Sequence, residues 1–305
     1  MDAPAVGPDV TLERKPMIFA VTGATGHLGT LAIDAMLERG IAPESIVAIG
    51  RSTQKLAELE ARGVQVRAAD YAKPDTLAAA FAGVDRLLFI SGSEVGQRVA
   101  QHGNVVTAAK DAGIGLIAYT SAPAADSSDL VLAPEHKATE ALIRASGIPF
   151  VILRNGWYTE NYSKVLEQAR HTGLIIASLG DGRIASASRR DYAEAAAVVL
   201  TGDGHTGQVY ELSGDTSWDY VELAVTIAGL IGREVTYHRV TPPEHRTILT
   251  DAGVPLPQAE FVVALDGNAR DGLLGGTSGE LSALIGRATT SLRDGLAEAL
   301  VPAEA

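Results

Sequence analysis

The stretch Thr22-Gly23-Ala24-Thr25-Gly26-His27-Leu28-Gly29 determines how the rest of the chain is interpreted. A short apolar run, residues 17–21, precedes it and predicts a buried strand, and apolar residues at helical spacing follow it up to Gly40. Glycine at positions 23, 26 and 29 lets the backbone turn sharply, approach a ligand closely and pack the helix against the strand. The start of that helix offers unpaired N–H groups and partial positive charge, so the stretch predicts a pyrophosphate site.

The end of the next predicted strand, residues 45–49, supports this interpretation. In a dinucleotide fold this point faces the adenosine ribose, where an acidic residue bonds the 2′-OH of NAD and an arginine pairs with the 2′-phosphate of NADP. Gly50 stands where the acid would be, and Arg51, Ser52 and Lys55 follow it as a charged, hydrogen-bonding set. We therefore expect NADPH rather than NADH. Without this second signal, an ordinary βα turn that binds nothing would remain the minor alternative.

Composition limits the class of protein. The chain has 305 residues, 46% of them hydrophobic, which is enough for a large globular core. A formal charge of −12 argues against nucleic acid as a partner, because phosphate binding needs a positive surface. The absence of cysteine excludes disulfides, thiolate metal sites and a cysteine nucleophile, and no metal site is expected.

The N-terminal residues 1–16 are polar and lack the long apolar core of a signal peptide or membrane anchor. We expect them to be a disordered extension, with Met17 as a possible alternative start. No apolar run in the sequence reaches the roughly 18 residues that a membrane span needs, so a cytoplasmic location without membrane partners is predicted.

Strand-type and helix-type stretches alternate after Gly40. Strands are predicted at residues 64–69, 87–90, 116–119 and 149–153, and helices at residues 75–82, 97–111 and 134–146. This repetition predicts an α/β fold with a Rossmann-type, doubly wound parallel sheet that binds ligands at the carboxyl ends of its strands.

The pattern loosens after Arg154. A last strand of the main sheet is predicted at residues 209–212, after an alanine-rich helix over 192–200 for which Asp191 is the expected cap. Further helices are expected at 160–172, 217–231, 242–252, 257–266 and 278–299, with strands at 183–188 and 234–240. We assign residues 17–154 and 190–214 to an NADP-binding Rossmann domain, and residues 155–189 and 215–305 to a smaller, mostly helical domain that caps the substrate.

One expected catalytic group is missing. In short-chain dehydrogenases, a Tyr-x-x-x-Lys pair supplies a proton and holds the nicotinamide ribose; Lys137 matches the lysine, but Ala133 stands four residues before it. Ketone reduction creates an alkoxide that needs such a donor, whereas a reduced quinone is a phenol with a pKa of about 10, against about 15.7 for water. The difference is on the order of 8 kcal/mol of charge stabilisation. The missing tyrosine therefore favours acceptors that become delocalised anions or neutral products.

A second constellation, Arg154-Asn155-Gly156-Trp157-Tyr158-Thr159-Glu160-Asn161-Tyr162, follows the sixth strand and holds three of the chain's few aromatic residues. These rings are either anchors between the two domains or part of the site. In the second interpretation Asn155 and nearby backbone groups bond the nicotinamide carboxamide, while an aromatic ring offers a flat face to a flat substrate. Lys137 and Tyr158 are the candidate catalytic residues.

The strings GATGHLG, SGSEVGQR with Gln101-His102, AYTSA, EHKATE, RNGWYTENY, GDGRIASASRRDYA and VYELSGD occur in this order. With them the chain resembles the NmrA-like atypical short-chain dehydrogenases over about residues 17 to 295. Within that group it is most similar to the type 2 NAD(P)H:quinone oxidoreductases, with the triphenylmethane dye reductases beside them.

The resemblance implies flavin-free, two-electron reduction by NADPH. The cofactor contacts that it implies are Gly23, Ala24, Thr25, Gly26, His27, Leu28, Arg51, Ser91, Gly92, Ser93, Asn155, Gly156, Trp157, Tyr158, Thr159, Glu160 and Ala187. Three residues depart from the quinone reductases: His27 replaces a glutamine, Gly92 replaces a serine, and Lys137 is unusual there although other members carry it.

Other polar residues have two interpretations each. His136 is a proton relay or, as we favour, an exposed helical histidine. Asp70 and Tyr71 stand where an adenine amino group would be met. Glu94, Gln97, Arg98 and His102 lie near the mouth of the cleft or only link a loop to its helix.

These observations predict an NADPH-dependent reductase of quinones or similar flat, electron-poor acceptors, acting on small molecules. Two alternatives remain. One is a triphenylmethane dye or imine reductase, and the other is a regulator that senses NADP(H) without turning it over. A homodimer is left open.

Overall fold

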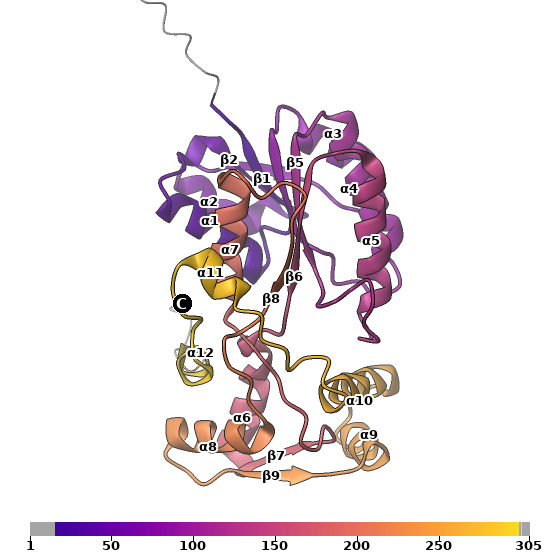
Figure 1. Ribbon diagram of the computed structural model, residues 1–305, viewed down its shortest axis with the longest axis vertical. Helices are drawn as coiled ribbons and strands as arrows, with labels where there is room; N and C mark the ends of the chain where they lie inside the picture. The colour runs from indigo at the N-terminus through magenta and orange to yellow at the C-terminus, as the bar shows by residue number, and fades with distance from the viewer. Residues whose placement is uncertain (1–15, 299, 301–305) are drawn as a thin grey trace, which may run out of the picture.

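The computed structural model describes residues 16–298 and residue 300, and in this range a parallel sheet forms the centre of the molecule (Figure 1). Its seven strands lie in the order β3-β2-β1-β4-β5-β6-β8, and every neighbouring pair is parallel. The strands are β1 (Phe19–Val21), β2 (Ile46–Gly50), β3 (Gln65–Ala68), β4 (Arg86–Phe89), β5 (Leu116–Ser121), β6 (Phe150–Asn155) and β8 (Val209–Leu212). Because the strand order reverses between β1 and β4, the sheet has the doubly wound arrangement predicted.

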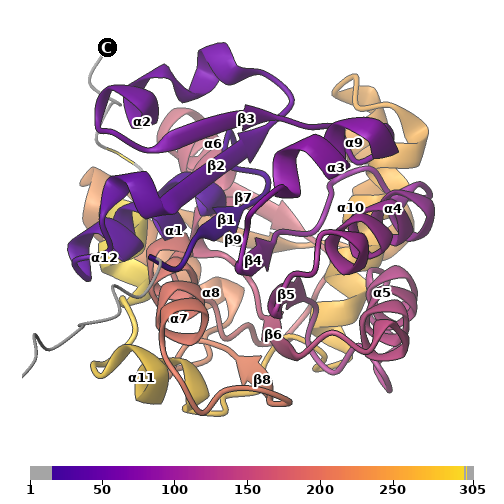
Figure 2. The same cartoon turned by 90° about the horizontal axis from the view of Figure 1, so that it is seen from above.

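Helices cover both faces of this sheet, as the view from above shows (Figure 2). On one face lie α1 (His27–Glu38), α2 (Ala57–Ala61), α7 (Arg189–Thr201) and α11 (Glu280–Ile285), and on the other α3 (Pro74–Phe81), α4 (Arg98–Asp111) and α5 (Ala133–Ser146). Each face has its own cluster of fully buried apolar side chains. The inner strands of the sheet are therefore buried on both sides and are largely apolar, whereas the edge strands β3 and β8 are only partly buried.

A second group of elements lies beyond the carboxyl ends of the strands (Figure 1). It comprises α6 (Ser163–Thr172), β7 (Leu174–Ala177), α8 (Tyr220–Ile231), β9 (Thr236–Arg239), α9 (Pro242–Asp251) and α10 (Leu256–Arg270), with β7 and β9 pairing in parallel. The 3-10 turn η3 (Thr159–Tyr162) and α12 (Leu292–Glu298) pack against this group. It has its own apolar cluster, in which the rings of Tyr162 and Trp218 meet edge to face with centroids 4.9 Å apart. Within the described range, no helix is both long and apolar enough to cross a bilayer.

Two predicted elements differ in the structure. The expected strand 183–188 is an extended crossing segment that makes only isolated bridges, Ile184 to Trp218 and Ala187 to Tyr158. Its backbone hydrogen bonds go to separate segments, at Trp157, Gly214, Trp218 and Leu274, so no continuous ladder forms. The expected helix 278–299 is instead α11 and α12, because Gly286 (φ +72°) ends α11 in a left-handed turn.

Other local predictions also need correction. Ser188, and not Asp191, is the N-cap of α7: its side chain accepts from the Asp191 N–H, while Asp191 accepts in return. The strand β7 and the helix α2 were not predicted. The expected disorder of residues 1–16 lies outside the described residues, apart from Pro16.

Candidate functional site

The glycine stretch forms the turn between β1 and α1. Gly23 has φ +64°, a conformation that residues with a side chain rarely adopt. A Cβ at Gly29 would lie 2.5 Å from the Gly23 carbonyl oxygen, so this glycine allows α1 to pack directly on the turn. A Cβ at Gly50 would lie 2.6 Å from the Thr25 methyl carbon. A side chain at position 50 would therefore require the Thr25 side chain to move.

A first cavity, cavity A, opens beside this turn and has a volume of about 300 Å³. It lies at the carboxyl ends of β1 to β4 and is lined by Gly23, Thr25, Gly26, Ile49, Gly50, Arg51, Ala69, Asp70, Tyr71, Ile90, Ser91, Gly92, Ser93, Glu94 and Gln101. This is the switch point of the sheet, where doubly wound folds bind ligands.

Two exposed charges face each other at the mouth of cavity A. The Arg51 guanidinium lies 3.1 Å from a Glu94 carboxylate oxygen, with side chains 71% and 51% exposed. Gln101 donates to the other Glu94 oxygen at 2.9 Å. Such an exposed pair is worth at most about 1 kcal/mol, so a ligand phosphate can take Arg51 from Glu94.

Tyr71 closes the inner wall of cavity A. Its hydroxyl lies 2.6 Å from Thr22 Oγ1 and 2.8 Å from the Ile90 carbonyl oxygen, so it ties the ends of β1 and β4 together. Burial raises the pKa of Tyr71 well above its usual value. Asp70 also lines the cavity.

A second cavity, cavity B, has a volume of about 310 Å³ and shares Ser91 with cavity A. It lies at the ends of β5 and β6, and its lining is Ser91, Arg98, Thr120, Ser121, Ala122, Pro123, Leu130, Leu132, His136, Asn155, Gly156, Trp157, Tyr158, Asn161, Arg189 and Leu274. Arg98 fixes the loop between the two cavities by donating to the Gly92 carbonyl and pairing with Glu135 at 3.2 Å. The prediction that Arg98 links this loop to its helix is confirmed, and Arg98 also faces cavity B.

Asn155 carries an unpartnered polar atom in cavity B. Its Oδ1 is buried and has no hydrogen-bond partner, while its Nδ2 lies 3.4 Å from the Tyr158 hydroxyl. A buried oxygen left without a donor costs roughly 1–3 kcal/mol. A ligand amide N–H group would satisfy it if a small turn of the Asn155 side chain brought Oδ1 to the surface of cavity B, which is the role that the sequence predicts for Asn155.

Tyr158 contributes an aromatic face that is held on two sides. Its ring meets Tyr192 edge to face at 5.2 Å, and the Arg189 guanidinium lies 5.1 Å from its centroid. Burial raises the pKa of Tyr158. Gly156, two residues earlier, leaves no room for a side chain, because a Cβ there would lie 2.8 Å from the Leu212 carbonyl oxygen.

The structure reverses the expectations for two neighbours on α5. Lys137 is exposed and does not line cavity B; its Nζ donates to the Asp126 carbonyl at 2.9 Å. His136, for which we favoured an exposed position, is only 5% exposed, lines cavity B and has its Nδ1 2.8 Å from the Tyr119 hydroxyl. Consecutive residues of a helix point to different sides, so His136 faces the protein interior while Lys137 faces solvent.

A buried ion network holds the frame of cavity B. The Arg154 guanidinium on β6 contacts Glu140 of α5 at 2.8 Å, Glu211 of β8 at 2.9 Å and Asp126 at 3.0 Å. Hydrogen bonds to Glu140 above all raise the pKa of Arg154. The Glu140 carboxylate also accepts from Ser121 at 2.7 Å, so one arginine fixes the helix that carries His136 to two strands.

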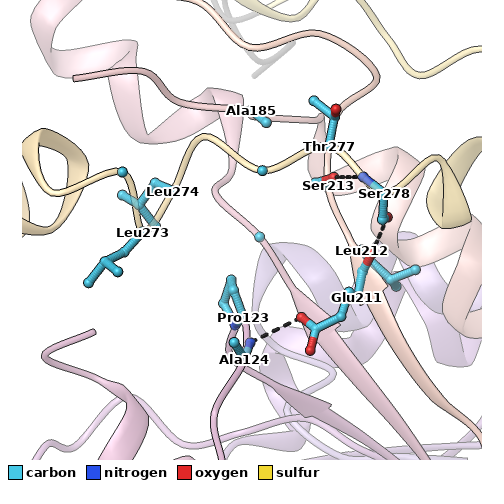
Figure 3. Close-up of a pocket in the computed structure, with 13 residues that line it drawn as sticks. Pro123, Ala124, Ala185, Glu211, Leu212, Ser213, Leu273, Leu274, Thr277 and Ser278 are labelled. Carbon is cyan, nitrogen blue, oxygen red and sulfur yellow. Dashed lines mark hydrogen bonds between the residues drawn. The ribbon is translucent and has the colours of Figure 1, made fainter. Parts of the chain in front are cut away.

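A third cavity, cavity C, of about 270 Å³, adjoins cavity B through Pro123, Gly156 and Leu274. Figure 3 shows most of its polar groups paired: Ala124 donates to the Glu211 carboxylate at 3.0 Å, Ser278 N–H donates to Ser213 at 3.2 Å, and the Ser278 hydroxyl donates to the Glu211 carbonyl, while Thr277 is drawn without a hydrogen bond. The remaining lining is mostly small or apolar, so cavity C offers apolar contact next to cavity B.

The predicted residues divide into two groups by position. Those that line cavity A or B are Gly23, Thr25, Gly26, Arg51, Ser91, Gly92, Ser93, Asn155, Gly156, Trp157 and Tyr158. Those that line neither are Ala24, His27, Leu28, Gly29, Ser52, Lys55, Thr159, Glu160 and Ala187. Thr159 instead bonds Ser186 at 2.8 Å, and Glu160 accepts from the Arg189 N–H at 2.8 Å.

Sequence reasoning missed Tyr119, Thr120 and Arg189. Tyr119 and Thr120 belong to the string AYTSA at the end of β5, where ligand contacts of this fold gather, and this position was the available signal.

The features of cavities A and B fit a phosphorylated nicotinamide dinucleotide. The two cavities adjoin at Ser91, with a guanidinium at one end and an unpartnered carboxamide oxygen at the other. The glycine turn that lines cavity A leads into the N-terminus of the 12-residue helix α1 and brings its backbone close to a ligand.

Comparison with known proteins shows the family. The chain belongs to the NAD(P)H-binding family, whose model matches residues 23–203. It is 45% identical over 277 residues to quinone oxidoreductase 2 of Escherichia coli, covering 91% of this chain and 96% of that protein. The predicted resemblance to the quinone oxidoreductases is thereby confirmed.

Solved structures agree. The NADPH complex of the NADPH-dependent quinone oxidoreductase QOR2 from Escherichia coli superposes with a TM-score of 0.88, at 45% identity over 92% of this chain and 99% of that one. The NADP(H) complex of Citrobacter sp. triphenylmethane reductase gives 0.88 at 40% identity, over 92% and 100% of the two chains.

Proposed function

We propose that this protein is an NADPH-dependent, flavin-free reductase that delivers hydride to quinones or similar flat, electron-poor small molecules. The observation that carries the proposal is the pair of adjoining cavities. Arg51 lines cavity A, the outer end of the site, and Asn155, whose Oδ1 has no hydrogen-bond partner, lines cavity B, the inner end. The 45% identity to a quinone oxidoreductase supports the same reaction.

In this proposal the residues of cavity A bind the cofactor. The N–H groups at the start of α1 hold the pyrophosphate, because the Ala24 and Gly26 N–H groups already donate to the Ile49 and Gly23 carbonyls. Arg51 exchanges Glu94 for the 2′-phosphate, which gives the preference for NADPH. Asn155 accepts a hydrogen bond from the carboxamide. The bound cofactor supplies the hydride.

The residues of cavity B orient the acceptor. Trp157 and Tyr158 offer aromatic surface to a flat ring, and Leu130, Leu132 and Leu274 exclude water. Orientation of this kind supplies much of the rate acceleration. Cavity C then takes an apolar substituent of the acceptor, because its polar side chains Glu211, Ser213 and Ser278 are already bonded within the protein.

Reduction of a triphenylmethane dye is the second candidate, and the likeness to the Citrobacter reductase favours it. A cationic dye becomes neutral on accepting hydride, so it needs no proton donor. We further propose that the protein acts in the cytoplasm, whether as a monomer or a homodimer, and that Lys137 supports the loop at Asp126 rather than the nicotinamide ribose.

The test is NADPH oxidation by the purified protein, without flavin, against a panel of benzoquinones, naphthoquinones and triphenylmethane dyes, with NADH in parallel. Turnover of quinones with NADPH preferred is expected. Turnover of dyes alone would select the second candidate. Tight NADPH binding with no turnover of any acceptor would instead identify a sensor.

A further inference from the structure

His136 and Tyr119 form a buried pair that none of the assigned roles uses. Tyr119, on β5, is fully buried and His136, on α5, is 5% exposed. The Tyr119 hydroxyl and His136 Nδ1 are 2.8 Å apart. One side of the imidazole is therefore fixed inside the protein, while the residue lines cavity B.

The contacts of Tyr119 favour one tautomer of His136. The Tyr119 hydroxyl lies 2.8 Å from His136 Nδ1, and the Thr139 side chain also lies beside it. A buried hydroxyl proton needs an acceptor, and we assign His136 Nδ1 as that acceptor because a neutral imidazole nitrogen accepts more strongly than a hydroxyl oxygen. In a neutral imidazole the proton then lies on Nε2.

The nearby His102 has the opposite tautomer, with its proton on Nδ1. His102 Nε2 accepts from the Gly92 N–H at 3.0 Å, so its Nδ1 donates to Thr139 at 2.8 Å. Thr139 in turn donates to the Glu135 carbonyl at 2.9 Å. The hydroxyl proton of Thr139 is thus engaged elsewhere.

His136 is held neutral. Burial first, and then the positive charge of Arg98 and His102, lower the pKa of His136 to about 3. Its Nε2 has no hydrogen-bond partner among the described residues, and this nitrogen is not fully buried from solvent. An N–H donor on a neutral ring therefore faces the open space of cavity B.

We propose that the Nε2–H of neutral His136, held in this tautomer by Tyr119, donates a hydrogen bond to the acceptor's carbonyl oxygen as that oxygen gains negative charge. This inference rests on the proposed function and gives His136 the place left by the missing tyrosine. A preorganised donor of this kind stabilises an oxyanion without moving at the moment of reaction.

The step balances without proton transfer from the histidine. The quinone gains a hydride, that is two electrons and one proton, from the dinucleotide, which is oxidised. The product is the hydroquinone monoanion, and a proton from water completes the hydroquinone. Because a neutral imidazole is a far weaker acid than a phenol, His136 keeps its proton throughout.

Two substitutions distinguish the roles of the two imidazole nitrogens of His136. His136→Gln places an amide N–H near the Nε2 position, whereas His136→Asn keeps a partner for Tyr119 but has no group at Nε2. We expect His136→Asn to lower kcat with quinones by about 100- to 1000-fold, the effect of removing one oxyanion donor. His136→Gln is expected to restore most of that loss, with KM for NADPH unchanged in both.

A cationic triphenylmethane dye is the matched control substrate. Hydride addition to its central carbon gives a neutral product and no oxyanion, so kcat with the dye should change less than threefold in His136→Asn. Equal losses with quinone and dye would overturn the proposal, because they would mean that His136 only supports the fold. Equal losses in the Asn and Gln variants would overturn it as well.

Two measurements on the protein without cofactor test the donor directly. Nitrogen-15 NMR of histidine-labelled protein should show His136 protonated at Nε2 and not at Nδ1, and Tyr119→Phe should disturb this signal. Binding of 4-nitrophenolate, a mimic of the oxyanion, should weaken about tenfold in His136→Asn and much less in His136→Gln. A proton on Nδ1, or equal phenolate binding in all variants, would refute the inference. Wild-type protein that turns over no acceptor, while both measurements agree with the expectation, would instead refute the proposed reaction.

Discussion

The two ends of the site are built on opposite physical principles. At the outer end, cavity A is formed by glycine backbone and by an exposed ion pair, Arg51 with Glu94. At the inner end, cavity B is framed by buried side chains, with Arg154 and Glu140 both about 5% exposed.

Because of this difference, one end of the site is suited to binding a ligand and the other to stabilising the fold. An exposed charge is well solvated and screened, so it can leave one partner for another at little cost. A buried charge has lost its hydration and depends on its partner. The outer end can therefore recognise a phosphate without contributing to stability, whereas the inner end holds the fold and the acceptor site together.

Glu140→Ala tests the strongest form of this contrast. It leaves the buried Arg154 guanidinium without its main partner, so we expect a loss of about 3–5 kcal/mol in the free energy of unfolding. Glu94→Ala, at the exposed pair, should cost no more than about 1 kcal/mol. Urea denaturation of the cofactor-free variants measures both. Similar losses would show that the two ends do not differ in this way.

Acid should also destabilise the inner end selectively. Burial, followed by the charge of Arg98, lowers the pKa of His102 to about 4, and that of His136 to about 3. Since both values lie below the ordinary 6.5, the folded state resists protonation. The stability is complete above pH 6.5 and falls, as the pH drops below it, by about 1.4 kcal/mol per pH unit for each histidine.

The control for acid sensitivity is an exposed histidine. Unfolding free energies measured from pH 7 to pH 4.5 should lose a large part of their slope in His102→Gln and in His136→Gln. His27→Gln, at the exposed start of α1, should keep the full slope. An unchanged slope in the first two variants would mean that other groups govern acid unfolding.

Arg51→Ala sharpens the contrast at the outer end. Because NADPH alone carries the 2′-phosphate, its Kd should rise by roughly 10- to 100-fold, as for the loss of a hydrogen bond to a charged group. The Kd of NADH should change less than about twofold. Calorimetric titration with both cofactors measures this.

Lys110→Ala is the matched control, because Lys110, at the end of α4, is exposed and does not line cavity A. It removes the same charge and should leave NADPH binding within about twofold. Equal weakening of NADPH and NADH by Arg51→Ala would exclude a phosphate contact.

The same contrast explains what the sequence could predict. The glycine turn and Arg51 are contiguous or follow a strand directly, so pattern and spacing were enough to place them. Cavity B unites side chains from β5, β6, α5 and the crossing segment, and no local pattern shows which face of α5 points inward. His136 and Lys137 are adjacent in sequence, and only the packing of α5 on β5 decides that the first is buried and the second exposed.

The smallest effect that we expect is a gain in affinity for NADPH. For Arg51 to reach a phosphate, its 3.1 Å contact with Glu94 must break, and the Glu94 carboxylate also repels the phosphate. Glu94→Gln weakens that competition while it keeps a polar partner for Gln101. NADPH should then bind up to about fivefold more tightly, within the 1 kcal/mol that an exposed pair contributes.

Salt and a distant charge distinguish this effect from a general change in net charge. The gain should shrink between 50 mM and 500 mM salt, because screening weakens exposed pairs first. Glu260→Gln, on the exposed side of α10 in the other group of elements, removes an equal charge far from Arg51 and should change nothing. If Glu94→Gln tightened the binding of NADH equally, Glu94 would not compete with the 2′-phosphate for Arg51. The Arg51–Glu94 pair would then affect cofactor binding in general rather than the preference for NADPH.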